Sequence, residues 1–494
     1  MKSVLAVVAF FSFCCRAKYV EQNISNITVS NQIILPGTFT PPPTFKNTKL
    51  VRIINLEKNF PRETLNIVVE NVDNATQNEY FLSFTSEQMK TVGALEVRDR
   101  NEIDEDPLEL QAVRVGNEEE TQYYRIKLSK PLPSRSRINL WISFSYLSSL
   151  IPKPKAIPQS GNQFLEYKFS AVAFSPYPTL NQKTDVKFPN SNIPEYTIIP
   201  KSDGRAESPS KAGSKFIYGP FSNTLARAFM PVKVRYQFTK PLIHMSKLER
   251  DIEISHWGGN VAFEERYSLI NRAANLSQLF SRVEWASSAY YNPPTTAIKE
   301  IKIPLKVGSL SPYYIDIIGN VSTSRFRSNK HEANLDIKPR YPIFGGWKYP
   351  FRIGWDADSK KYLRKLETRD GYVLNVPFLE GPKKAEGVEY KSVEVRIILP
   401  EGAKNIKYST TVPLISANIS LHKTFMDTIG RSTLTLTAKN IFDDQRDREL
   451  IITYDYSLIA SLRKPLVLFS GFFSLFVGAW LTGSLDIGIR AKAV

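Results

Sequence analysis

An uncharged apolar segment close to the C-terminus constrains this chain more than any other feature. Residues 466–485 read LVLFSGFFSLFVGAWLTGSL and lie between Pro465 and Asp486. At the helical rise of about 1.5 Å per residue, such a segment covers about 30 Å, which is the hydrocarbon thickness of a bilayer. We therefore expect one transmembrane helix over residues 463–485, followed by a short tail over residues 486–494.

The N-terminus has the layout of a secretory signal peptide. Lys2 gives a basic start, residues 4–15 are apolar apart from Ser12, and Ala17 is a small residue where cleavage would fall. We expect a signal peptide over residues 1–17; the alternative is a signal anchor that is retained. Cleavage would place the body of the chain in the endoplasmic reticulum lumen. The result would be a single-pass type I membrane protein with a cytosolic tail.

Small side chains recur every four residues within the apolar segment. Ser470, Ser474, Gly478 and Thr482 would form one stripe along a helix, which we call the small-residue stripe. Packed transmembrane helices use such stripes to bring their backbones close. The stripe therefore predicts contact with a partner helix, although chance recurrence of common small residues is the alternative.

The positions of the cysteines and the net charge limit the kinds of site and partner that the chain can have. Both cysteines, Cys14 and Cys15, lie in the expected signal peptide, so the rest of the chain offers no disulfide, thiol nucleophile or cysteine–zinc site. The formal net charge is +17. A basic face would attract anionic lipid headgroups or acidic polypeptide, and the alternative is a merely well-solvated surface. Nucleic acid is not an expected partner in the lumen.

Period-two alternation dominates the body of the chain. Apolar side chains alternate with polar ones over residues 138–146, 232–238, 301–307, 393–397, 434–436 and 452–456. Each segment is typical of a strand with one buried face. We therefore expect a mainly β protein with sandwich-like domains. Helical periodicity is scarce, and its clearest instance predicts a helix over residues 274–288.

The length of the body predicts two tandem lumenal β domains. We place the boundary near residue 240, which gives domains over residues 18–240 and 241–462, because residues 239–242 follow one strong strand and precede another near residue 251. Residues 202–215 (SDGRAESPSKAGSK) nearly lack large apolar side chains. They are expected to form a flexible loop inside the first domain.

Six Asn-x-Ser/Thr triplets lie between the signal peptide and the apolar segment, where glycosylation could reach them. They begin at Asn23, Asn26, Asn74, Asn275, Asn320 and Asn418. Of these we expect Asn320, Asn74 and Asn418 to be modified most readily.

Signatures of catalysis are mostly missing. The chain contains no phosphate-binding Gly-Lys loop, no Gly-x-Ser-x-Gly and no His-x-x-x-His pair. His256 invites a catalytic-triad hypothesis, but a structural histidine beside Trp257 is the favoured interpretation. The Asp-x-Asp patterns at residues 104–106 and 356–358 could hold a divalent cation, yet solvated turns are the simpler interpretation. We expect no catalytic residue, no cofactor and no metal site.

Several blocks of the second domain resemble ribophorin I, a subunit of the oligosaccharyltransferase of the endoplasmic reticulum. They are residues 248–258 (LERDIEISHWG), 318–324 (IGNVSTS), 338–348 (KPRYPIFGGWK) and 398–406 (ILPEGAKNI). The similarity is strongest over residues 240–410. Within the third block, FGGW is typical of a tight turn whose aromatic rings fill a core. A carbohydrate-binding aromatic platform is the alternative.

The resemblance implies a non-catalytic, structural subunit of a membrane complex. In that complex a separate multi-span subunit would transfer a preassembled oligosaccharide from dolichyl pyrophosphate to asparagine. The other subunits would be partners, and the resemblance leaves contact with nascent polypeptide open. Two rival hypotheses remain: an independent lumenal enzyme with an unrecognised site, and a free-standing chaperone or glycan-binding receptor. Animal members have a longer cytosolic region associated with ribosome contact, and the short tail expected here puts that role in doubt.

Overall fold

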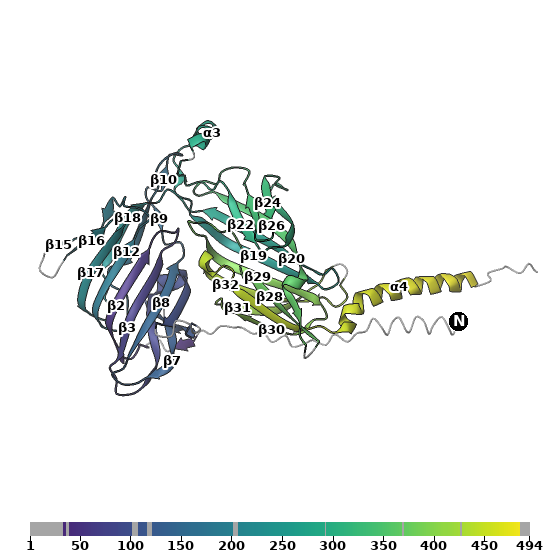
Figure 1. The fold of residues 1–494 in the computed structure, drawn as a ribbon, viewed down its shortest axis with the longest axis horizontal. Coiled ribbons are helices and arrows are strands. Elements are labelled where there is room, and N and C mark those ends of the chain that lie inside the picture. Colours follow the sequence, from purple (N-terminus) through teal and green to yellow (C-terminus); the bar gives the residue numbers. More distant parts are fainter. Residues whose placement is uncertain are drawn as a thin grey trace, which may run out of the picture.

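The computed structural model describes residues 33–35, 39–100, 107–115, 121–200, 206–291, 293–367, 370–424 and 427–484. These residues form two β bodies and a long C-terminal helix (Figure 1). The expected signal peptide, the tail over residues 486–494 and the triplets at Asn23 and Asn26 lie outside the described residues. The mainly β prediction is confirmed.

The first body is built on a seven-stranded sheet. In order across the sheet, its strands are β16 (Ser210–Ala212), β17 (Lys215–Thr224), β12 (Thr179–Lys187), β2 (Phe45–Asn55), β3 (Arg62–Asn71), β8 (Arg137–Tyr146) and β5 (Val92–Asp99). The pairs are antiparallel except for β2 and β12, which run parallel. The predicted strand over residues 138–146 is β8, in which apolar side chains face the core.

Two smaller sheets cover this sheet and enclose two hydrophobic clusters. The first contains β1 (Ile33–Leu35), β6 (Leu110–Val115), β7 (Thr121–Leu132) and β4 (Gln77–Thr85), and a short helix, α2 (Ser86–Thr91), follows β4. The second contains β13 (Glu195–Tyr196), β18 (Pro231–Gln237), β11 (Phe164–Ser170) and β9 (Ile151–Pro152). The first body is therefore two sandwiches that share one sheet.

The second body repeats this plan around one continuous core. Its seven-stranded sheet runs β23 (Ser309–Asp316), β26 (Lys348–Asp358), β20 (Asn260–Asn271), β19 (Ile243–Ser255), β29 (Glu389–Glu401), β32 (Arg431–Phe442) and β31 (Ser416–His422). The covering strands are β22 (Ile301–Leu305), β25 (Ala333–Ile337) and β24 (Ser324–Ser328) in one sheet, and β27 (Leu363–Lys365), β28 (Gly371–Pro377), β33 (Glu449–Asp455) and β30 (Lys404–Thr410) in the other.

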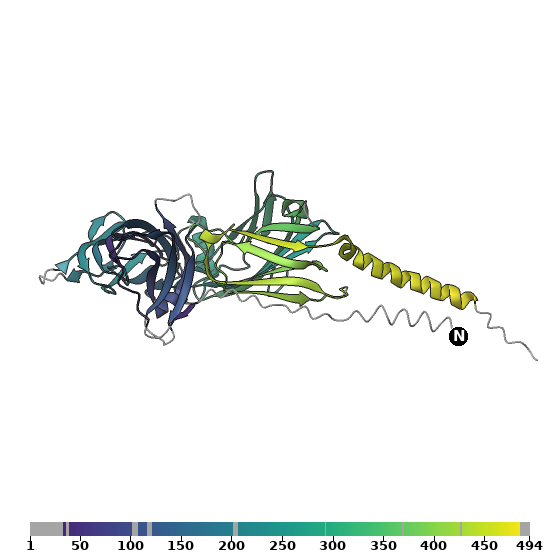
Figure 2. The ribbon, with the colours of Figure 1, turned by 90° about the horizontal axis from the view of Figure 1, so that it is seen from below.

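The two bodies lie side by side (Figures 1 and 2). A two-stranded parallel pair, β10 (Ala156–Ile157) with β21 (Asn275–Leu276), connects them. The buried cores change over between Leu242 and Ile243, although Ala273 packs in the first body. We propose on this basis to keep the domain boundary near residue 240.

Two local predictions differ from the structure. The helix expected over residues 274–288 is instead β21 followed by α3 (Arg282–Tyr291), because Asn275 and Leu276 pair with β10 of the first body. The loop expected over residues 202–215 contains β16 and β15 (Ala206–Glu207), which pairs with β14 (Ile199–Pro200). Backbone pairing with neighbouring segments thus gives structure to a stretch that has few apolar side chains.

The C-terminal helix α4 (Leu458–Ser484) leaves the end of the second body (Figure 2). Within the described residues it is the one helix long and apolar enough to cross a membrane, and its apolar part is not buried by the rest of the molecule. It begins before the span predicted over residues 463–485 and runs without a break through Pro465. The single C-terminal helix expected from the sequence is therefore present and longer than expected.

Candidate membrane junction and interdomain contacts

Four of the six predicted glycosylation triplets lie in described residues, and the asparagine is exposed in each. Asn74 follows β3, Asn275 begins β21, Asn320 lies between β23 and β24, and Asn418 lies in β31. An attached glycan needs a side chain that reaches solvent. Burial therefore excludes none of these four positions.

The first turns of α4 are attached to the second body through Trp257. This residue lies in the turn between β19 and β20, and its indole N–H donates a hydrogen bond of 2.8 Å to the carbonyl oxygen of Ser461. In an uninterrupted helix the N–H of residue 465 would bond that carbonyl, but Pro465 has no N–H. Trp257 therefore supplies the donor that the proline removes, which allows the helix to continue.

An ion pair holds the next turn of α4. The Nζ of Lys464 lies 2.6 Å from Oδ1 of Asp427, a carboxylate without exposed side-chain surface. Arg431 and Thr424 also donate to this carboxylate. Burial disfavours the charged form of Asp427, but the hydrogen bonds from Lys464, Thr424 and Arg431 outweigh burial and lower its pKa. The base of α4 is thus fixed to the turn between β31 and β32.

In the small-residue stripe Ser470, Gly478 and Thr482 are exposed and Ser474 is half-buried. The hydroxyl groups of the stripe bond to their own helix. Ser474 Oγ donates to the carbonyl of Ser470 at 2.7 Å, and Thr482 Oγ1 donates to the carbonyl of Gly478 at 3.1 Å. The stripe therefore needs no polar partner. Close contact of this stripe with a neighbouring helix stays a prediction.

His256 lies among tyrosines of the second body. Its Nε2 is 2.8 Å from the hydroxyl of Tyr454, and the rings of Tyr372 and Tyr456 pack against the imidazole. Burial lowers the pKa of His256. Trp257 does not stack on this ring as the sequence interpretation expected, because its indole is turned to Ser461. The surroundings are those of a structural histidine.

The second Asp-x-Asp pattern forms a turn. Asp358 caps the 3₁₀ helix η1 (Ser359–Lys361) by accepting from the N–H of Lys360, and Asp356 accepts from Asn260. No group of three or more His, Cys, Asp or Glu side chains suited to a metal ion occurs among the described residues. Residues 104–106 lie outside the part of the chain that the structure describes.

The FGGW turn is part core and part surface. Phe344 is fully buried and contacts Phe280 and Trp285, and Trp347 is half-buried against Tyr341. Gly345 packs on the backbone of Ala273 and Ala274, where a Cβ would come within about 2 Å of a carbonyl oxygen. The turn thus serves the core through Phe344, while Trp347 stays partly exposed.

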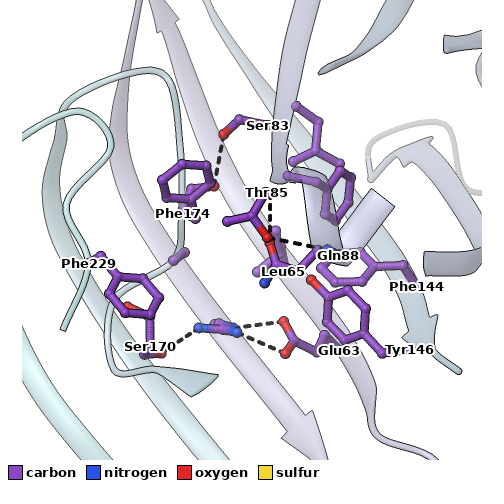
Figure 3. Close-up of a pocket in the computed structure, with 14 residues that line it drawn as sticks. Glu63, Leu65, Ser83, Thr85, Gln88, Phe144, Tyr146, Ser170, Phe174 and Phe229 are labelled. Carbon is purple, nitrogen blue, oxygen red and sulfur yellow. Dashed lines mark hydrogen bonds and ion pairs between the residues drawn. The ribbon is translucent and has the colours of Figure 1, made fainter. Parts of the chain in front are cut away.

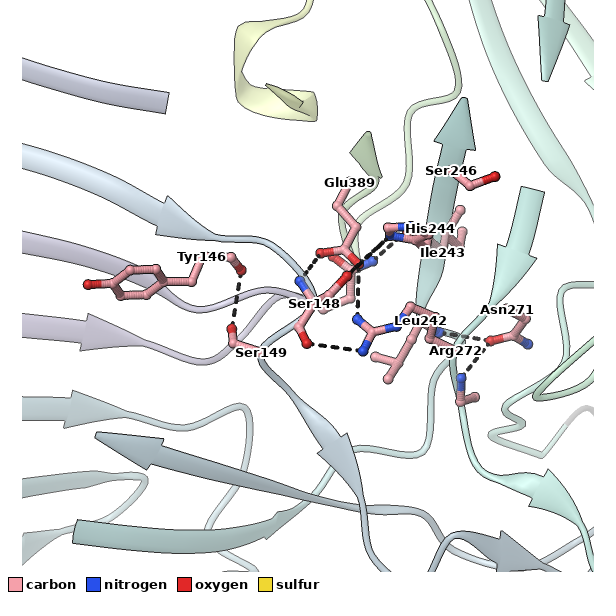
Figure 4. A network of polar contacts seen from close by, with 12 residues as sticks. Tyr146, Ser148, Ser149, Leu242, Ile243, His244, Ser246, Asn271, Arg272 and Glu389 are labelled. Carbon is pink, nitrogen blue, oxygen red and sulfur yellow. Dashed lines mark hydrogen bonds and ion pairs between the residues drawn. The ribbon is translucent and has the colours of Figure 1, made fainter. Parts of the chain in front are cut away.

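A buried polar network links the two bodies (Figure 4). Glu389, at the start of β29, accepts from Nδ1 of His244 at 2.8 Å and from Nη1 of Arg272 at 3.3 Å. It also accepts from the N–H and hydroxyl of Ser148, which belongs to the first body. Arg272 in turn donates to the carbonyl of Ser148 at 3.0 Å. One buried carboxylate therefore satisfies donors from both bodies.

Further contacts extend this interface. Lys58 of the first body pairs with Asp444 at 2.6 Å, in the 3₁₀ helix η2 (Asp443–Gln445) of the second. The side-chain amide of Asn440 donates to the carbonyls of Lys90 and Val92, and Gly93 leaves no room for a Cβ against Asn440. The bodies are held together by ion pairs and close backbone approach as well as by the buried network.

A small pocket in the first body surrounds a second buried ion pair (Figure 3). Arg52 donates to both oxygens of Glu63, at 2.9 and 2.8 Å, and to the carbonyl of Ser170 at 2.6 Å. The hydroxyl of Tyr167 donates to Glu63, and burial together with this carboxylate raises the pKa of Tyr167. The pocket measures about 30 Å³, which suits one or two water molecules and is too small for a substrate.

Sequence reasoning missed these charged residues, although a pattern marks them. Arg52 stands on the same strand face as Leu50 and Ile54, so alternation places its charge in the core. Arg250 follows the same rule between Leu248 and Ile252, and it pairs in the core with Glu265 and Glu380. A charge in the apolar phase of a strand is the pattern that could have identified them.

The family of this chain follows from a match that covers most of its sequence. The family model described as Ribophorin I matches residues 45–483, which include the first body from β2 onward, the whole second body and nearly all of α4. This chain belongs to the ribophorin I family. The resemblance seen in the sequence blocks therefore extends over almost the whole described chain.

Curated relatives of this ribophorin I chain bear names of glycosyltransferase subunits. "Dolichyl-diphosphooligosaccharide--protein glycosyltransferase subunit 1B" of Oryza sativa subsp. japonica is 33% identical over 374 residues, 74% of this chain and 74% of the relative. Subunit 1B of Arabidopsis thaliana is 30% identical, covering 89% of this chain and 93% of the relative. Subunit 1 of Caenorhabditis elegans is 29% identical, covering 90% and 73%.

Solved structures give only a distant likeness. An M1 zinc metallopeptidase from Deinococcus radiodurans aligns with 42% of this chain and 42% of its own at 10% identity, with a TM-score of 0.25. A score this low gives no basis for a shared activity.

Proposed function

We propose that this chain is a non-catalytic, structural subunit of the oligosaccharyltransferase complex of the endoplasmic reticulum membrane. The complex transfers a preassembled oligosaccharide from a dolichyl-diphosphate donor to asparagine in Asn-x-Ser/Thr of nascent polypeptides. The observation that carries this proposal is the ribophorin I match over residues 45–483, together with relatives at about 30% identity that are named as subunits of this transferase.

A structural role agrees with how the polar groups are used. His256 bonds Tyr454, Asp358 caps a helix, and Glu389 satisfies four donors between the bodies. These groups are engaged in holding the fold. We propose that both bodies lie in the lumen, that α4 spans the membrane, and that the multi-span catalytic subunit is among the partners.

Three experiments test the proposal. Extraction of membranes in mild detergent should recover the full chain in a particle much larger than its own mass, together with the other subunits. Protease added to sealed microsomes should leave both bodies intact, which tests the lumenal orientation. In cells that lack the native chain, H256N and D356N/D358N variants should restore glycosylation of a reporter as well as the wild type does.

Specific results would contradict the proposal. Migration of the chain near its own mass would favour a free-standing receptor. Loss of glycosylation by H256N, with assembly of the complex unchanged, would favour catalysis by this chain.

A further inference from the structure

A pocket of about 320 Å³ lies where the second body meets α4. Its lining includes three aromatic residues, Trp257, Tyr372 and Tyr456, and two charged ones, Lys365 and Asp370. The ammonium of Lys365 lies 3.6 Å from the carboxylate of Asp370, and both side chains are well exposed. The pocket therefore combines aromatic side chains, of which Trp257 is the most exposed, with one charge of each sign.

This combination matches a zwitterion that contains a quaternary ammonium group. Aromatic faces attract quaternary ammonium ions through their negative π surface, and a nearby carboxylate adds to that attraction. A lysine ammonium suits a phosphate. Burial lowers the pKa of His256, which also lines the pocket, and so disfavours a positive charge on the imidazole; Lys365 is the cation placed to meet the phosphate.

The position of the pocket points to a lipid as the source of such a group. Leu458 and Ser461 of α4 line one side, so a headgroup in the pocket could extend its acyl chains along the exposed apolar helix. Trp257 remains 65% exposed although its only polar atom is bonded to Ser461. An indole in this state gains free energy at the boundary between headgroups and acyl chains.

The spacing along α4 supports the same placement. Trp257 is held at the level of Ser461, and Trp480 lies nineteen residues further along the helix. At about 1.5 Å per residue this separation is about 28 Å, close to the hydrocarbon thickness of a bilayer. The two indoles are therefore spaced like the aromatic belts at the two membrane interfaces.

We propose that this pocket binds the phosphocholine headgroup of a phospholipid in the leaflet next to the second body. Lys365 meets the phosphate, and the aromatic walls with Asp370 meet the choline. The proposal rests on the membrane span proposed for α4. It adds a specific lipid site at the end of the second body that meets α4. The fluorescence of Trp257 can show how deep this site lies in the bilayer.

Quenching by brominated phosphatidylcholine tests the membrane placement. The full chain in nanodiscs should lose tryptophan fluorescence, and both W257F and W480F should reduce that loss. If W480F reduces quenching and W257F does not, the pocket lies away from the lipid and the headgroup site is wrong. If neither variant changes quenching, α4 is not in the bilayer, which overturns the proposed span and the headgroup site with it.

Titration with phosphocholine tests the chemistry. The full chain in phosphatidylglycerol nanodiscs should show a saturable fluorescence change with phosphocholine and a much weaker one with inorganic phosphate. D370N should bind phosphocholine about fivefold more weakly. E367Q, which removes an exposed carboxylate outside the pocket, should bind as the wild type does. Equal binding of phosphate, equal binding by D370N, or no response to phosphocholine would each overturn the proposal.

Discussion

The indole N–H of Trp257 bonds the carbonyl oxygen of Ser461 that Pro465 leaves without its helical donor. Trp257 lies 204 positions before Ser461 and supplies a donor to a helix that the proline would otherwise kink or end. The repair matters because it lies where the β body passes into the proposed membrane helix.

This hydrogen bond predicts that the effects of W257F and P465A on amide exchange are not additive. W257F should leave the Ser461 carbonyl unpaired at a cost of about 1 kcal/mol, so that amide exchange in residues 458–464 becomes about fivefold faster. P465A restores a backbone N–H at position 465, and on that background W257F should change exchange much less. Hydrogen-exchange mass spectrometry of the full chain measures both effects. Equal effects of W257F on the two backgrounds would contradict the relationship.

The Asp427–Lys464 pair predicts a pH dependence. The hydrogen bonds lower the pKa of folded Asp427 below its ordinary value of 3.8, so the charged form stabilises the fold at pH values above 3.8. D427N should cost about 2 kcal/mol at pH 7, and the difference from wild type should be unchanged at pH 5. It should shrink as the pH falls below about 4. Thermal unfolding at each pH measures this.

The matched control for D427N is E253Q. Glu253 also pairs with Arg431, but nearly half of its side chain is exposed. Its loss should change stability by about 0.5 kcal/mol or less at every pH. A D427N effect that grows on acidification would mean that the pKa is raised in the fold.

Removal of the buried carboxylate between the bodies should loosen them. E389Q takes the charge from donors of both bodies and should lower the free energy of unfolding by about 3 kcal/mol. Limited proteolysis should then cut residues 239–242 faster. E394Q is the control on the same strand, because Glu394 is more exposed and its partner Lys247 lies 3.5 Å away. Equal proteolysis of the two variants would remove Glu389 from this role.

The small-residue stripe predicts helix packing. Leucine at positions 474 and 478 would fill the shallow surface, so S474L/G478L should reduce co-purification of partner subunits severalfold. F472L/F476L changes side chains of α4 outside the stripe and should leave recovery unchanged. If both variants recover partners equally, the stripe is not the contact.

Glycan occupancy can be assigned by substitution. We expect N320Q, N74Q and N418Q each to lower the mass of the protein by one enzyme-cleavable glycan, because each asparagine is exposed. Intact-mass measurement before and after deglycosylation reads this directly. S322A should reproduce N320Q, since it destroys the same triplet and keeps the asparagine.

The strands could be predicted because their pattern is local. In β3, neighbouring residues alternate between core and surface, so a short window of sequence contains the information. The helix α4 could be predicted for the same reason, since a continuous apolar segment contains the information. Distant pairing could not be predicted: Leu276 forms β21 only because Ile157 is its partner.

The candidate sites were less accessible to prediction for the same reason. Pro465 indicates a helix boundary by itself, and the donor that compensates for it lies in another element. Ser148, His244 and Glu389 have no sequence pattern in common, since their network forms only when two bodies meet. Arg52 and Arg250 are the exceptions, because their places among the inward-facing residues of their strands can be seen in the sequence.

Attachment of the first turns of α4 at two points, Trp257 and Lys464, restricts the angle between the helix and the second body. If the bilayer thins or thickens, a spanning helix changes its tilt to match. Here that change would be passed to the body and, through the Glu389 network, to the first body as well. The first body would then change its position above the membrane, so that the thickness of the bilayer would determine which part of the membrane surface it faces.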